Sequence, residues 1–425
     1  MYFTNTVGTL LAATLVASKQ SSIISHSYCC SYQRGVDFAY GSTPVRGVNI
    51  GGWLVLEPWI TPSIFQAVDQ SLGIVDEYTL TEQLGTEAAL AILKPHWDSW
   101  CTADDFQKIA NAGFNTVRIP IGYWAYELSD NEPYTQGAAP YMDAAIDWAR
   151  GAGLKVWIDL HGAPLSQNGF DNSGHKTSSP AFGQGDSVAK TLSVLNTITE
   201  KYAQKEYQDV VVGIELLNEP ANWKVNFDVL KQFYRDGYGQ VRAVSDSIVV
   251  IHDAFLAPSN WNNILSSNDN SAYGVVVDHH EYQVFSDSLV AMSATEHIDY
   301  VCSNAGAYTG ADKWVVVGEF TAAMTDCAYA LNGYGVGARY DGTYPGSSYV
   351  GSCEGKSDIT TWSDAFKTDM KNYLSAQLAS YETKANGWIF WNFKTEGAHE
   401  WDAAKLVEYG IFPDLRAGTP AAICS

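Results

Sequence analysis

Eight short runs of β-branched and other apolar residues recur along this chain, and no other feature limits its fold as strongly. The runs are Val45–Asn49, Thr116–Ile119, Lys155–Asp159, Val211–Asn218, Ile248–Asp253, Val275–His279, Val315–Glu319 and Gly387–Trp391. Between most of them the apolar residues follow the period of a helix, as in Asp104–Ala112, Tyr141–Arg150 and Asp228–Val244. Strands that alternate with helices predict an α/β fold, a closed (β/α)8 TIM barrel. A doubly wound open sheet is the alternative.

The same pattern indicates how the chain is divided. No linker or repeat interrupts residues 41–425, so we expect one barrel domain there. Residues 1–18 carry no charge and contain an apolar run that is too short to span a bilayer but typical of a signal peptide. Residues 19–40 are then an N-terminal extension or a propeptide. We therefore expect a secreted protein, free or associated with the cell wall, with no membrane span.

Polar, ionisable or tryptophan side chains stand at the ends of several of these runs. They are Arg118, His161, Asn218, Glu219, His279, His280, Glu319 and Trp391. In a barrel the carboxyl ends of the strands meet at one mouth, where the catalytic residues of such enzymes lie. The sequence therefore predicts a single site at that mouth.

Two glutamates stand out in this set. Glu219 follows an apolar strand and Asn218, and Glu319 ends another apolar strand further along. One such carboxylate alone could simply interact with the start of a helix. Two carboxylates that face one cleft suit glycoside hydrolysis, in which one acid protonates the leaving oxygen and the other attacks or activates water.

Several sequence blocks around these glutamates together resemble a known family. The blocks are Val45–Ser63, Phe114–Trp124, Asp159–Pro164, Gln167–Gly174, Asn218–Pro220, Asp278–Phe285, Trp314–Phe320 and Gly387–Glu396. They resemble, in the same order along the chain, the secreted fungal exo-β-1,3-glucanases of family 5, clan A, of the glycoside hydrolases. The blocks cover nearly all of the chain after the N-terminal extension.

The resemblance implies a role for each catalytic candidate. Glu219 would be the acid/base and Glu319 the nucleophile of a retaining double displacement. Arg118 and Tyr282 would flank Glu319 and favour its ionised form. His280 would lie close to both carboxylates.

The resemblance also implies a set of sugar-binding residues. Asn218 would hold the sugar 2-hydroxyl, and His161 would face the sugar at the non-reducing end. Glu57 and Asn172 would bind that terminal glucose, with Trp391 as its stacking floor. The aromatic pair at the pocket entrance would be Phe170 and Phe285. Each of these residues also has a simpler interpretation as a packing or ion-pair residue of the core.

The seven cysteines add a constraint of their own. In a secreted chain they favour disulfides, and their odd number leaves at least one thiol unpaired. The resemblance pairs Cys302 with Cys424 and Cys327 with Cys353, and it leaves Cys101 free. The Gly/Ser/Tyr-rich stretch between the members of the second pair is then a long loop held by a disulfide.

The net charge of the chain limits which kinds of partner it can bind. The net charge of −22 repels phosphate backbones, so we expect no nucleic acid partner. We expect a monomer that needs no metal or other cofactor and acts on a β-glucan, releasing glucose from non-reducing ends. A β-1,6-glucanase, an endo-glucanase or a transglycosylase is the alternative within enzymes, and a carbohydrate-binding barrel without activity is the alternative outside them.

Overall fold

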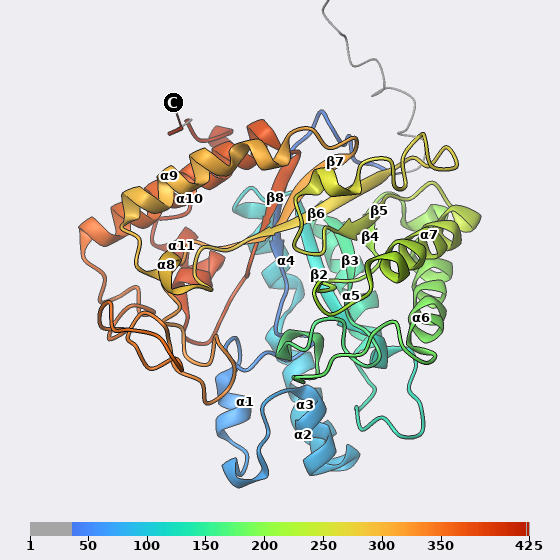
Figure 1. The fold of residues 1–425 in the computed structure, drawn as a ribbon, viewed down its shortest axis with the longest axis horizontal. Coiled ribbons are helices and arrows are strands. Elements are labelled where there is room, and N and C mark those ends of the chain that lie inside the picture. Colours follow the sequence, from blue (N-terminus) through green and yellow to red (C-terminus); the bar gives the residue numbers. More distant parts are fainter. Residues whose placement is uncertain (1–35, 422, 425) are drawn as a thin grey trace, which may run out of the picture. The chain divides into compact units, whose positions relative to one another are not determined.

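The computed structural model describes residues 36–421 and 423–424, and its centre is a closed barrel of eight parallel strands (Figure 1). The strands are β1 (Val45–Asn49), β2 (Thr116–Gly122), β3 (Lys155–Gly162), β4 (Val211–Glu215), β5 (Val249–His252), β6 (Val275–Glu281), β7 (Trp314–Phe320) and β8 (Gly387–Phe390). They are neighbours in sequence order, and β8 pairs with β1 to close the ring. This confirms the predicted barrel and excludes the open sheet.

The predicted strand after Val211 is shorter than expected. β4 ends at Glu215, although the backbone amides of Leu216 and Asn218 still donate to Val250 and Leu160 of the two neighbouring strands at 3.0 Å. Beyond them Glu219 has a φ of 44°, a left-handed conformation that continues neither a strand nor a regular helix. The chain therefore leaves the barrel wall directly after Asn218, at the mouth of the barrel.

Helices surround the barrel. They are α1 (Pro62–Gln66), α2 (Glu77–Leu84), α3 (Thr86–Trp100), α4 (Ala103–Asn111), α5 (Ala139–Ala152), α6 (Ser187–Tyr202), α7 (Phe227–Val244), α8 (Asp287–Val290), α9 (Ala294–Asn304), α10 (Asp364–Lys384) and α11 (Ala403–Glu408). Figure 1 shows α9 and α10 packed side by side, as are α6 and α7. The connection from β5 to β6 contains only a short 3-10 helix, Pro258–Trp261, so it departs from a complete (β/α)8 repeat.

Three apolar clusters hold this arrangement together. The largest lies between the strands and the helices, where residues such as Val117, Val156 and Leu216 are fully buried. A third cluster includes Trp391 and Trp401. The second lies in the barrel interior, and Phe38 and Tyr40 belong to it. The packed core thus begins ahead of residue 41, the expected start of the domain. The predicted signal peptide and most of the predicted extension lie outside the described residues.

Disulfides tie down the chain at two places. Cys302 bonds to Cys424, and Cys327 bonds to Cys353, with Cα–Cα distances of 5.2 Å in both pairs. Cys101 is a buried free thiol. The structure contains the pairs that the resemblance implied, and the second encloses the predicted loop after β7. Within the described residues, no helix is long and apolar enough to cross a membrane.

Candidate active site

The predicted site residues gather at the carboxyl ends of the barrel strands. A cavity of about 580 Å³ opens there. Its lining includes these predicted residues: Glu57, Phe170, Asn172, Glu219, His280, Tyr282, Phe285, Glu319 and Trp391. Arg118, His161 and Asn218 do not line it and are fully buried behind its wall. The structure therefore brings the twelve predicted residues together, nine on the surface of the cavity and three behind it, and the sequence did not predict this division.

Glu319, on β7, is held by two donors that differ in charge. The Arg118 guanidinium donates from Nη1 to Oε1 at 2.9 Å, and the Tyr282 hydroxyl donates to Oε2 at 2.8 Å. Arg118 comes from β2 and Tyr282 from the residue after β6, so the closed barrel brings the three together. Both oxygens of Glu319 are thus occupied by groups that remain donors at neutral pH.

Glu219, just beyond β4, has a different environment. Its Oε2 accepts from Nδ2 of Asn172 at 3.0 Å, and its Oε1 lies 2.8 Å from Nδ1 of His280. Asn172 lies in the 3-10 helix Asp171–Ser173, outside the barrel wall. The left-handed backbone of Glu219 is an uncommon conformation for a residue with a side chain, and such strain concentrates at functional sites.

His280 connects the two glutamates. Its Nδ1 is 2.8 Å from Glu219 Oε1 and 3.3 Å from Glu319 Oε2, so those two oxygens are at most about 6 Å apart. Its Nε2 lies 3.2 Å from Asp278 Oδ2. Burial alone would lower the pKa of His280, but the charges of Glu319 and Asp278 outweigh it, and the pKa lies well above its ordinary value. These contacts favour the protonated form of His280, with Nδ1 facing both glutamates and Nε2 facing Asp278.

The pKa values of the two glutamates are shifted in opposite directions. Burial raises the pKa of Glu319, although the charges of His280 and Arg118 oppose the rise. Burial acts in the same direction on Glu219, but the hydrogen bond and charge of His280 outweigh it, and the pKa of Glu219 lies below its ordinary value. Because His280 contacts both groups, the pair titrates as a unit.

Arg118 lies at the centre of a buried ionic cluster that sequence reasoning missed. Besides Glu319, its guanidinium lies 2.7 Å from Glu215, 3.2 Å from Asp159 and 3.6 Å from Asp278. Burial raises the pKa of Glu215 well above its usual range, although the Arg118 charge opposes the shift. The sequence did contain a signal for this cluster. Asp159 and Asp278 each stand two residues before a site histidine, and side chains two apart on a strand point to the same face.

The amide of Asn218 and the ring of His161 are oriented by this cluster. Asn218 Oδ1 accepts from Arg118 Nη2 at 2.8 Å, and its Nδ2 lies 3.4 Å from His161 Nε2. The opposite nitrogen of His161, Nδ1, is 2.6 Å from Asp159 Oδ2. His161 also stacks on the Trp391 ring, with centroids 5.6 Å apart. His161 was expected to face the sugar, but the structure places it as a support behind the wall.

The inner end of the cavity combines a carboxyl group with tryptophans. Glu57 Oε2 accepts from the indole nitrogen of Trp59 at 2.9 Å. Burial, followed by the charge of Asp171, raises the pKa of Glu57 well above its ordinary value. Trp391 is only 3% exposed, and Trp401 lies beside Trp59 with ring centroids 5.0 Å apart. Flat apolar rings beside polar groups suit the faces and hydroxyls of a sugar.

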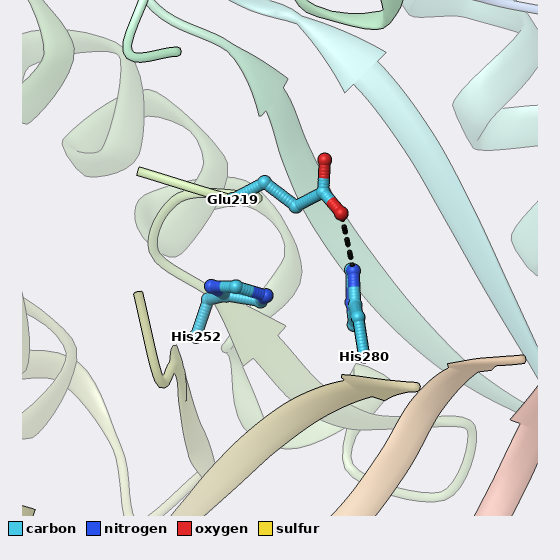
Figure 2. A group of neighbouring side chains, drawn as sticks. All are labelled: Glu219, His252 and His280. Atoms are coloured by element: carbon cyan, nitrogen blue, oxygen red, sulfur yellow. Dashed lines mark hydrogen bonds and ion pairs between the residues drawn. The ribbon is translucent and has the colours of Figure 1, made fainter. Parts of the chain in front are cut away.

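One group of side chains in the site has the residue types of a metal centre. The ligand atoms of Glu219, His252 and His280 lie within 4.8 Å of one another (Figure 2). Nδ1 of His252 already accepts the Ala254 amide at 3.0 Å, which leaves Nε2 as its free nitrogen. His280 would have to release the proton on Nδ1, which faces both glutamates, while Asp278 faces the other nitrogen, Nε2. These residues therefore fit a proton-bearing network better than a metal centre.

Comparisons with known proteins agree with this geometry. The family model for cellulase (glycosyl hydrolase family 5) matches residues 81–334. The chain belongs to glycosyl hydrolase family 5. Among relatives in sequence, a glucan 1,3-beta-glucosidase of Blumeria graminis is 49% identical over 90% of this chain and 89% of its own length. Glucan 1,3-beta-glucosidase 2 of Wickerhamomyces anomalus is 48% identical over 90% of each chain.

Solved structures show the fold of the family at greater distance. The rutinosidase of Aspergillus niger has a TM-score of 0.67 at 19% identity and covers 88% of this chain and 98% of its own. The structure of AoRut has a TM-score of 0.70 at 18% identity and covers 89% and 99%. At these identities the likeness supports the barrel alone, and the family 5 assignment rests on the sequence matches.

Proposed function

We propose that this family 5 protein is a retaining exo-β-1,3-glucanase that releases glucose from the non-reducing ends of β-1,3-glucans. The observation that carries the proposal is the pair Glu219 and Glu319, two buried carboxyl groups joined through His280 at the mouth of the barrel. Their closest oxygens lie within about 6 Å, which suits the short separation of retaining enzymes, ~5–5.5 Å, better than the wider gap of inverting ones.

The reaction would proceed in two displacements. Glu319 attacks the anomeric carbon while Glu219 gives its proton to the glycosidic oxygen, so the C1–O bond breaks and a glycosyl ester forms on Glu319. Glu219 then takes a proton from water, and the resulting hydroxide oxygen attacks C1 and releases Glu319. Glu219 gives up its proton in the first step and regains one from water in the second, so the enzyme ends unchanged.

In the free site the pKa of Glu319 is raised and that of Glu219 is lowered, the reverse of what a nucleophile and an acid need. The assignment of the two roles therefore rests on the hydrogen-bond donors to Glu319. Arg118 and Tyr282 stay bonded to Glu319 and keep it an acceptor, as a nucleophile must be. His280 lies near both carboxylates and can turn its donor from Glu219 to Glu319. Glu219 then loses its charged partner, and burial raises its pKa as an acid requires.

The remaining site residues would bind the terminal glucose. Arg118 fixes Asn218 Oδ1, and Nδ2 of Asn218 lies beside His161 behind the wall, so this amide would have to release His161 to donate to the 2-hydroxyl. Glu57 and Asn172 would bind further hydroxyls, and Trp391 would stack on the ring. Phe170 and Phe285, 39% and 43% exposed, would flank the next glucose at the entrance.

Exo action is supported by the walls of the cavity. Three of its tryptophans and Glu57 are buried, and the disulfide-held loop after β7 adds Asn332, Arg339 and Tyr344 to its side. A pocket of this kind accepts the end of a chain more readily than its middle. The β-1,3 linkage is supported by the names of the relatives, which are 43–49% identical.

We also propose that the protein acts outside the cell, where two disulfides persist, and that β-glucan of the cell wall is within its reach. Incubation with laminarin, pustulan and cellulose tests the specificity. Glucose as the sole early product, and faster from laminarin than from the other two, is the expected result. Early oligosaccharides would indicate an endo-glucanase, and faster cleavage of pustulan would indicate a β-1,6-glucanase.

A further inference from the structure

An aromatic strip continues outward from the site, and the proposed roles use only its innermost member, Phe170. It consists of Phe170, Phe255 and Trp223, all of which line the cavity. The ring centroids of Phe170 and Phe255 are 6.5 Å apart, and those of Phe255 and Trp223 are 5.1 Å apart. Neither Phe255 nor Trp223 was predicted from the sequence as a site residue.

Trp223 is unusual among the tryptophans of this protein. All 14 lie within the described residues, and Trp223 is the most exposed of them, with 56% of its surface accessible. A large apolar ring left in water beside a cavity is a recognised feature of binding surfaces. Packing alone does not account for it, because most of the ring contacts solvent.

The backbone beneath the strip is built to hold it. Ala254 and Phe255 both have a φ of 60°, in the left-handed region that side chains rarely adopt. Their amides donate to His252 Nδ1 at 3.0 Å and to Asp253 Oδ1 at 2.9 Å. Asn222 Nδ2 donates to the Ala254 carbonyl at 2.5 Å, which ties the loop after β4 to the loop after β5. The loops that carry Trp223 and Phe255 are therefore linked to each other, and the two rings are in contact.

The exposed fraction of the side chains increases from the site outward along the strip. Trp391 and Glu57, at the inner end, are 3% and 4% exposed, whereas Phe170 at the entrance is 39% and Trp223 is 56% exposed. A glucan whose terminal glucose occupies the inner end would pass Phe170 first. Its following residue would then meet Phe255 and Trp223.

We propose that Trp223, supported by Phe255, forms an additional sugar-binding subsite for the second glucose beyond the cleaved bond. This inference rests on the proposed function, because the direction of the chain follows from where the terminal glucose binds. The ligand is a β-linked glucan of at least three residues, and the contact is stacking of an indole on a sugar face. A disaccharide does not reach this subsite.

The test compares a disaccharide with a trisaccharide in binding and in turnover. Binding of laminaribiose and laminaritriose is measured by calorimetry in a Glu319→Gln background, with and without Trp223→Ala. The ratio of their kcat/KM values is measured in the otherwise wild-type enzyme. Trp223→Ala should reduce the preference for laminaritriose about three- to tenfold in both experiments, the range expected of one aromatic contact. Trp223→Tyr should restore at least half of it.

Tyr409→Ala is the matched control, since Tyr409 is an aromatic residue that is 41% exposed and does not line the cavity. It should leave the preference within about 1.5-fold of wild type. An unchanged preference in Trp223→Ala, or an equal loss for laminaribiose, would overturn the subsite. If wild type cleaves neither sugar but Trp223→Ala still weakens trisaccharide binding, the proposed function fails while the subsite stands. Melting temperatures identify a variant that has misfolded, and Trp223→Leu then replaces it.

Discussion

The hydroxyl of Tyr282 offers a clean test of how Glu319 is activated. It donates to Glu319 Oε2 at 2.8 Å, while the ring packs on Phe285 and Trp401 with centroids 5.5 Å away in both cases. Tyr282→Phe removes one oxygen and keeps these contacts. A hydrogen bond to a charged group contributes about 1.5–3 kcal/mol, so kcat/KM should fall roughly 10- to 150-fold.

The assay is steady-state hydrolysis of laminaritriose, together with denaturant unfolding of the same preparations. Tyr202→Phe is the matched control, because the Tyr202 hydroxyl donates to Asp143 at 2.7 Å on the outside of the barrel. It should leave kcat/KM within about twofold of wild type. Loss of the donor should also raise the pKa of Glu319, so the acid limb of the kcat/KM profile should move to higher pH. A loss in Tyr282→Phe below threefold with an unmoved limb would refute the proposed hydrogen-bond support of Glu319.

Three further predictions concern the nucleophile, the loop and pH. Glu319→Gln should reduce hydrolysis of laminarin at least about a thousandfold, since covalent attack needs a carboxylate, and a smaller loss contradicts the assignment. The double variant Cys327→Ser and Cys353→Ser should lose about 3 kcal/mol of unfolding free energy in urea, because the bond closes a loop with a sequence separation of 26 residues. Burial raises the pKa of Glu400 from 4.5 to about 7. The folded state therefore binds its proton more tightly than the unfolded state, and the contribution of Glu400 is full below pH ~4.5 and lost as pH rises through ~7. The free energy of unfolding is measured by denaturation at several pH values, and in Glu400→Gln it should fall by about 3 kcal/mol less across this window than in wild type. An equal fall in both proteins would contradict the raised pKa of Glu400.

The barrel could be predicted because each of its strands is an apolar run that must be buried on both faces. The runs beginning at Val45, Lys155 and Val275 start where the structure starts β1, β3 and β6. A parallel strand leaves this local signature whatever its neighbours are. The ends of the strands were harder to predict. The apolar run continues to Leu217, but β4 ends at Glu215 and the backbone turns at Glu219.

The support of the site was harder to predict than its surface. His161 looked like a sugar contact, yet Asp159 and the Trp391 ring hold it behind the wall. Which side of a wall a strand-end residue occupies depends on packing from the other strands. Phe255 and Trp223 were missed for a related reason, since loops from two different strands bring them together and neither has a periodic pattern in sequence.

The anomeric form of the first glucose released tests the central claim most directly. Laminaritriose is mixed with enzyme in an NMR tube, and the anomeric protons of the product are followed before mutarotation mixes them. Two displacements at C1, by Glu319 and then by water, retain configuration, so β-glucose should appear first. If α-glucose appears first, a single displacement has occurred, and the role of Glu319 as nucleophile is contradicted.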